Sequence, residues 1–138
     1  MFISATAFAQ SDMSVQADAE LKKYVNKVVL QVKSTDDPVE KRAILNESLD
    51  RLSGSLASVK TIASLTGEDK EFIDSFMNTL QEQQNELNGL EGFSKVQDPD
   101  LDDFADYMQQ DIEQANRTIT ISLTSALLVA LILVLIAT

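Results

Sequence analysis

Cysteine, histidine and tryptophan are absent from the 138 residues of this chain. Without cysteine, the chain can form no disulfide and no thiolate metal site. Because it has neither cysteine nor histidine, it lacks the side chains that most often act as nucleophile–base pairs and as transition-metal ligands. No carboxylate is set beside a catalytic base or a phosphate-binding loop. We therefore expect a protein that is not an enzyme and that binds no cofactor and no metal.

One acidic stretch has to be distinguished from a calcium site. Asp98, Asp100 and Asp102 alternate along the chain, as the first ligands of an EF-hand loop do. That loop also needs glycine at its sixth position and glutamate at its twelfth, and these positions hold Asp103 and Gln109. We interpret the aspartates as helix-capping acids instead.

Basic residues are in short supply, since 11 lysines and arginines stand against 22 aspartates and glutamates, for a net charge of −11. This excess argues against nucleic acid as a partner and against adhesion to anionic lipid. Residues 11–65 hold eight acids and eight bases, whereas residues 66–116 hold fourteen acids and two lysines. The acidic half predicts either a well-solvated surface or a docking face for a basic partner.

The longest hydrophobic run is residues 118–138, which contain no charged residue, no glycine and no proline. As a helix, this run would extend about 31 Å, close to the hydrocarbon thickness of a bilayer. We predict that it is a single transmembrane helix, with the lipid bilayer as its partner. Within it, small residues lie four apart, a spacing that lets helices pack closely in lipid: Ser122, Ala126 and Ala130.

Residues 1–10 are apolar and end in Ala7-Phe8-Ala9 before Gln10, as a cleaved secretory leader ends. The run is short for a leader, and no lysine or arginine precedes it. We interpret it as the remnant of a signal peptide, with a disordered or membrane-touching N-terminus as the alternative. A leader would place residues 11–117 outside the cytoplasm, in the periplasm or the extracellular space.

The acidic domain, residues 11–117, has helical periodicity with a few clear interruptions. A first helix is predicted over residues 11–33. Residues 37–40, Asp-Pro-Val-Glu, combine a capping aspartate, a proline at the first helical position and an acid in the first turn. They predict a second helix that ends near Leu65. Gly54 lies inside this helix, off its apolar face.

Two further helix starts follow the same logic. Thr66 and the acids after it predict a third helix from about Glu68 to Leu90, with Gly92 as its stop. Asp98-Pro99 predicts a fourth helix that opens in the same manner as the second. No proline or glycine lies between Asp100 and the end of the chain. We therefore expect the fourth helix to continue into the membrane as a rigid rod.

Apolar residues of the second and third helices step by four and three, which is the heptad pattern of packed helices. Phe72 and Phe76 widen the seam of the third helix, and Gln84 places a polar residue in it. These seams are predicted to pack on each other or on the helices of a partner. Their members are Leu45, Leu49, Leu52, Leu56, Val59, Ile73, Met77, Leu80 and Leu87.

These features predict an all-α protein, a small helical-hairpin or coiled-coil bundle of about four helices whose last helix is continuous with the membrane span. The leading functional hypothesis is a non-catalytic, single-pass subunit whose extracytoplasmic domain docks other subunits of a membrane complex or associates with itself. A tail-anchored cytosolic coiled-coil tether of fusion type is the alternative. A pore formed by oligomerised anchors is a weaker one, because the middle of the span has no ionisable residue.

Overall fold

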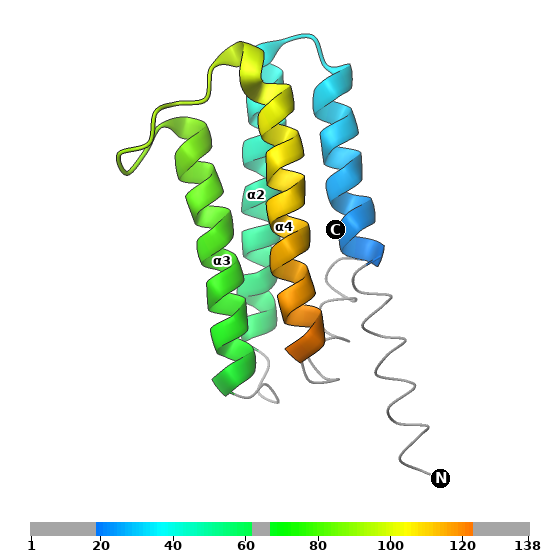
Figure 1. The fold of residues 1–138 in the computed structure, drawn as a ribbon, viewed down its shortest axis with the longest axis vertical. Helices are drawn as coiled ribbons and strands as arrows, with labels where there is room; N and C mark the ends of the chain where they lie inside the picture. The colour runs from blue at the N-terminus through cyan, green and yellow to red at the C-terminus, as the bar shows by residue number, and fades with distance from the viewer. Residues whose placement is uncertain (1–18, 62–66, 123–138) are drawn as a thin grey trace.

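The computed structural model describes residues 19–61 and 67–122, with side chains described as far as Gln114. The first helix occupies residues 19–34, and it is followed by α2 (Pro38–Lys60), α3 (Gly67–Asn88), the 3₁₀ turn η1 (Asp98–Asp100) and α4 (Leu101–Ser122). Successive helices run in opposite directions and form a four-helix bundle (Figure 1). The prediction of an all-α bundle with four helices is confirmed.

The two ends of the bundle differ. One end, which we call the loop end, carries the connection 35–37 and the connection 89–100 (Figure 1). The opposite end, which we call the terminal end, holds the end of α2, the start of α3 and the last turn of α4. Because the number of helices is even, the first helix starts from the terminal side and α4 returns to it.

The start of α2 forms as the sequence predicts. The carboxylate of Asp37 accepts a hydrogen bond from the Val39 N–H at 3.0 Å, and Pro38 occupies the first helical turn. The helix ends at Lys60 rather than near Leu65, because Thr61 closes it. The Thr61 hydroxyl donates to the carbonyl of Ser58, which satisfies one of the last free carbonyls. The predicted cap at Thr66 lies outside the described residues.

The end of α3 corrects the prediction that Gly92 stops this helix after Leu90. Gly89 does so, with a positive φ of 69° directly after Asn88. The Leu90 N–H then donates to the Asn85 carbonyl at 2.8 Å, which is the long bond of a Schellman motif. Gly92, at φ 85°, lies in the loop beyond it.

The start of the fourth helix also differs from the prediction. Asp98 does not cap it, because its carboxylate lies 3.3 Å from the guanidinium of Arg42 in α2. Gln97 is the cap residue, without a side-chain hydrogen bond, and the turn η1 precedes α4. An acid-proline pair therefore opens a helix in both places, but only Asp37 is free to serve as the cap.

One continuous core runs through all four helices. The first helix contributes Leu21, Val25, Val28, Val29 and Val32, while α4 contributes Leu101, Phe104, Ala105, Met108 and Ile112. The polar position in the seam of α3 is Gln83, which is 1% exposed, rather than Gln84. The stripe of α3 thus runs through Ile73, Phe76, Leu80, Gln83 and Leu87. Met77 packs at its margin.

Candidate functional site

The predicted seam residues of α2 lie within the chain's own core. Leu45, Leu49 and Val59 are fully buried, and Leu52 and Leu56 are nearly so. In α3, Ile73, Leu80 and Leu87 are buried in the same core, and Met77 is partly buried. The structure therefore shows the first of the two packing arrangements considered above, in which the helices pack on each other. A partner would have to contact other surfaces.

The predicted membrane span is described only at its start. Its residues 118–122 form the last turns of α4, and Ser122 is the final residue of that helix. Ala126, Ala130 and the rest of the span lie outside the described residues, as does the N-terminal segment 1–10. Within residues 19–61 and 67–122, no helix combines the length and the apolar character needed to cross a bilayer.

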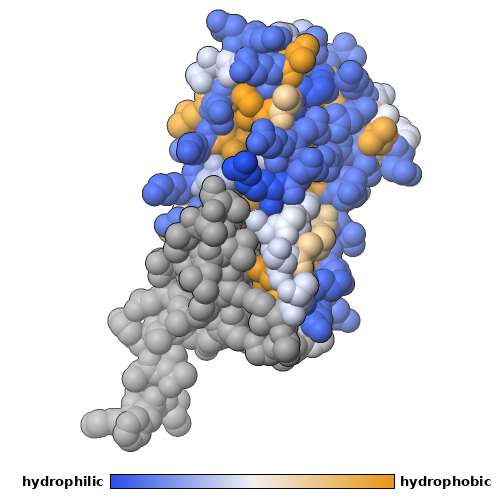
Figure 2. Space-filling view, turned by 180° about the vertical axis from the view of Figure 1, so that it is seen from behind, coloured by the Kyte–Doolittle hydropathy of each residue, from blue (hydrophilic) through white to orange (hydrophobic). Residues whose placement is uncertain are grey.

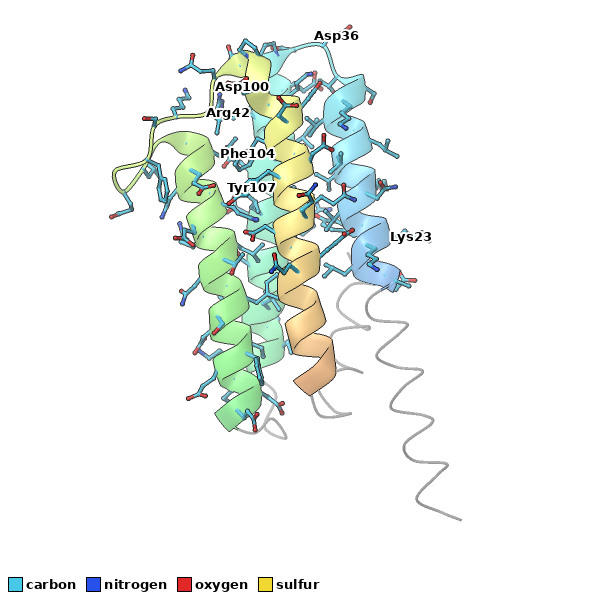
Figure 3. All side chains as sticks on the ribbon, viewed as in Figure 1. Lys23, Asp36, Arg42, Asp100, Phe104 and Tyr107 are labelled. Atoms are coloured by element: carbon cyan, nitrogen blue, oxygen red, sulfur yellow. The ribbon has the colours of Figure 1, made fainter. Side chains whose placement is uncertain are left out.

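The loop end presents exposed apolar side chains. Val39 at the start of α2 is 77% exposed, and Leu90 and Phe93 in the loop after α3 are 51% and 36% exposed. Seen from behind, the surface is mostly hydrophilic, with separate hydrophobic residues toward the loop end (Figure 2). Exposed carboxylates occur at the same end, where Figure 3 shows Asp36 and Asp100. Apolar side chains among acids suit a partner that is both apolar and basic.

Arg42 of α2 joins the connection after α3, residues 89–100, to the bundle (Figure 3). Its guanidinium donates to the Leu87 carbonyl and to the Val96 carbonyl, each at 2.6 Å, as well as pairing with Asp98. It therefore satisfies a carbonyl in the last turn of α3 and fixes the chain before η1. This role is not predictable from the sequence, because no local pattern distinguishes Arg42 from a solvated arginine on a helix.

Three further ion pairs join the first half of the chain to the acidic half. Lys33 of the first helix pairs with Asp106 at 2.9 Å. From α2, Lys41 pairs with Asp102 at 2.7 Å and Lys60 with Asp74 at 2.5 Å. The electroneutral first half therefore neutralises part of the acidic half, but these pairs and that of Arg42 engage only four of its fourteen carboxylates within the described part of the chain.

A strip of such carboxylates lies along the groove between α3 and α4. It consists of Glu82, Glu86 and Asp111, with Tyr107 beside them, and we call it the acidic strip. No ion pair joins its three carboxylates to a cation of the described chain. Gln83 lies buried beside the strip. Its side-chain amide donates to Asp111 at 2.9 Å, and its side-chain carbonyl oxygen has no hydrogen-bond partner among the described residues.

The surroundings of Glu86 in the acidic strip raise its pKa. Partial burial raises its pKa above the ordinary value of 4.5, the charge of Glu82 raises it further, and a hydrogen bond from Tyr107 opposes both. Because the pKa of Glu86 is higher in the folded than in the unfolded chain, its ionisation opposes folding. The stabilisation that comes with protonation of Glu86 is complete below the pKa of the unfolded chain, and it is lost as the pH rises through the pKa of the folded chain.

We expect the substitution Glu86→Gln to stabilise the protein at pH 7, since it removes the disfavoured charge but keeps a side chain that can bond to Tyr107. The gain should disappear below about pH 4.5, where the glutamate is protonated in both states. Urea unfolding between pH 3.5 and 8 measures it. In a Glu82→Gln background the gain should be smaller, and a gain that is the same at every pH would contradict this explanation.

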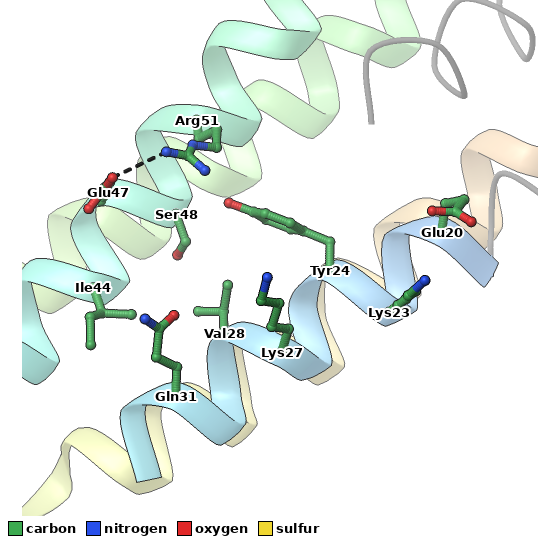
Figure 4. A pocket seen from close by; sticks show the side chains of 10 residues that line it. All are labelled: Glu20, Lys23, Tyr24, Lys27, Val28, Gln31, Ile44, Glu47, Ser48 and Arg51. Atoms are coloured by element: carbon green, nitrogen blue, oxygen red, sulfur yellow. Dashed lines mark hydrogen bonds and ion pairs between the residues drawn. The ribbon is translucent and has the colours of Figure 1, made fainter. Parts of the chain in front are cut away.

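A cleft of about 710 Å³ lies between the first helix and α2, at the opposite side of the bundle from the acidic strip. Its wall contains Lys23 and Lys27 from the first helix and Arg51 from α2, together with Glu20 and Glu47. In Figure 4, the ammonium of Lys27 and the hydroxyl of Tyr24 point into the space between the two helices. We call this the basic cleft. Burial raises the pKa of the Tyr24 hydroxyl above its ordinary value of 10.0.

Arg51 and Lys27 of the basic cleft make few ion pairs with other described residues. Arg51 pairs with Glu47 at 3.2 Å, one turn away on an exposed face, and Lys27 forms no ion pair with another described residue. The part of the chain that the structure describes contains no group of three or more acidic side chains arranged to hold a metal ion. No protein-family model, no curated protein and no solved structure matches this chain.

Proposed function

We propose that this protein is a non-catalytic, single-pass membrane subunit whose helical bundle docks a partner of a membrane complex outside the cytoplasm. The observation that carries the proposal is the continuity of α4, which runs without a break from Leu101 to Ser122 and so enters the apolar run 118–138. A helix that leaves a packed bundle and continues into lipid holds the bundle at a fixed orientation to the membrane.

The difference between the two ends of the bundle supports docking at the loop end. If α4 enters the membrane at the terminal end, the loop end faces away from the bilayer. There the exposed Val39, Leu90 and Phe93 lie among carboxylates, and Arg42 anchors the loop through its hydrogen bond to the Val96 carbonyl. A preformed loop loses little entropy on binding, which favours it as a contact surface. The tail-anchored cytosolic tether remains the alternative, since this geometry is the same on either side of a membrane.

Vesicle flotation tests the anchor. The full chain should float with zwitterionic vesicles and resist extraction at high salt, whereas a variant that ends at Arg117 should stay at the bottom of the gradient. Because the chain lacks cysteine, a single cysteine in place of the exposed Ser94 reports the side of the membrane through an impermeant maleimide. Labelling on intact cells supports the extracytoplasmic position, and labelling only after lysis supports the cytosolic alternative. A full chain that does not float would refute the proposal.

The same membranes test the docking surface. Proteins that copurify with the full chain in mild detergent should be lost when Leu90 and Phe93 are both replaced by serine. The control is Leu30→Ser, which changes a leucine on the first helix that is more exposed, at 59%, than Leu90 or Phe93. Partners that stay bound to the loop variant, or that are lost equally in the control, would exclude the loop end as the docking surface.

A further inference from the structure

The basic cleft, where three cations outnumber two carboxylates, and the acidic strip carry opposite net charge and lie on opposite sides of one bundle. The groove between α3 and α4 holds the strip, and the groove between the first helix and α2 holds the cleft. In an antiparallel four-helix bundle these two grooves face away from each other. Neither surface can therefore reach the other within one chain, although each suits the other in charge.

The two surfaces also lie at the same height along the bundle. The ion pair between Lys33 and Asp106 places those residues level. From that level toward the terminal end, Lys27 lies six residues away in the first helix and Asp111 lies five away in α4. At the helical rise these steps are about 9 Å and about 7.5 Å, so the two side chains differ in height by only about 1.5 Å.

The other pair of helices gives the same result. The Gln84 amide donates to Asp50 at 2.8 Å, which places these two residues of α3 and α2 level. Arg51 directly follows Asp50. Glu82 and Glu86 lie two residues on either side of Gln84, about 3 Å above and below it. The cation of the cleft is thus level with the middle of the acidic strip.

We propose that the basic cleft binds the acidic strip of a second copy of this chain, so that upright bundles associate side by side in the plane of the membrane. Copies that share one membrane orientation differ only by rotation about its normal and by sliding in its plane. Two complementary surfaces at equal height can therefore meet without tilting either bundle, and repetition of the contact closes a ring or extends a row. This arrangement rests on the proposed membrane anchor.

The electrostatics of the single chain support this contact. Glu82 and Asp111 repel Glu86, and no ion pair with a described cation offsets that repulsion. Lys27 of a neighbour would supply one cation, and Arg51, whose pair with Glu47 lies on an exposed face, would supply a second. The Tyr24 hydroxyl and the Gln31 amide, which also line the cleft, provide hydrogen-bonding groups for carboxylates.

Charge reversal in two variants tests the proposal. One variant carries Lys27→Glu with Arg51→Glu, and the other carries Glu82→Lys with Glu86→Lys. Each full chain, labelled at a single cysteine in place of the exposed Ser58, is reconstituted in zwitterionic vesicles, and energy transfer between labelled copies is measured. Each variant alone should lose most of the transfer of the wild type. A one-to-one mixture of the two should recover it, because both contacts then join opposite charges again.

The control is Lys60→Glu with Lys70→Glu, which changes the net charge by the same amount away from both surfaces and should leave the transfer unchanged. Circular dichroism verifies that each variant is folded. Loss that the mixture does not reverse, loss in the cleft variant alone, or transfer equal to that of the wild type in all variants would overturn the proposal. Flotation of the same vesicles is read separately, so failure of the anchor is distinguished from failure of the contact.

Discussion

Replacing Gly89 with alanine is expected to lower the free energy of unfolding by about 2–4 kcal/mol. Gly89 has φ 69°, a conformation that costs a residue with a side chain about 1–2 kcal/mol. A Cβ atom there would also lie 2.8 Å from the backbone nitrogen and 3.0 Å from the Cα of Lys95. Since these are backbone atoms, relief of the clash requires the loop to move away from the end of α3.

Gly54→Ala is the matched control. Gly54 lies inside α2, is exposed, and has no atom within 4 Å of an added Cβ. Alanine should stabilise the protein there by up to about 1 kcal/mol, because it restricts the unfolded chain and favours the helix. Urea unfolding of the two variants, followed by circular dichroism, should therefore shift in opposite directions. Shifts of the same sign would show that the conformation of Gly89 is not the reason.

Replacing Arg42 with methionine is expected to lower the free energy of unfolding by about 2–4 kcal/mol. The substitution keeps the length of the side chain but removes its hydrogen bonds to the carbonyls of Leu87 and Val96 and its pair with Asp98. The Arg42 side chain is only 15% exposed, so water cannot fully replace its hydrogen bonds. The loss should be local, with faster amide exchange at Phe93, whose N–H bonds to the Leu90 carbonyl.

Arg51→Met provides the comparison within the same helix. Arg51 forms one exposed pair with Glu47, so its removal should cost about 0.5 kcal/mol or less. Unfolding midpoints in urea and hydrogen exchange measure both variants. Equal losses at the two arginines would mean that Arg42 does not fix the loop in the way that its contacts indicate.

The bundle was accessible from the sequence because its determinants are local and repeat. The spacing of Leu45, Leu49 and Leu52 identifies a buried face before any partner helix is known. The cap at Asp37 depends on residues within one turn, and it was predicted correctly. Asp98 is also followed by a proline, but a distant arginine engages its carboxylate, and sequence spacing carries no information about that contact.

The candidate surfaces were less accessible for the same reason. The acidic half was evident from composition, but which carboxylates stay unpaired depends on the registers between helices, as at Lys33 and Asp106. The buried glutamine of α3 shows the limit of the heptad argument. Gln83 and Gln84 both fit an apolar stripe at helical spacing, but it is Gln83 that is buried, with its amide bonded to Asp111 of α4.

Because the four helices run antiparallel, the length of the bundle sets the distance between its two ends. A seven-residue insertion in one helix alone would disrupt its packing, but one heptad added to all four would keep every seam in phase and raise the loop by about 10 Å. The standoff of Leu90 and Phe93 from the end where α4 leaves the bundle is thus set by the number of heptads.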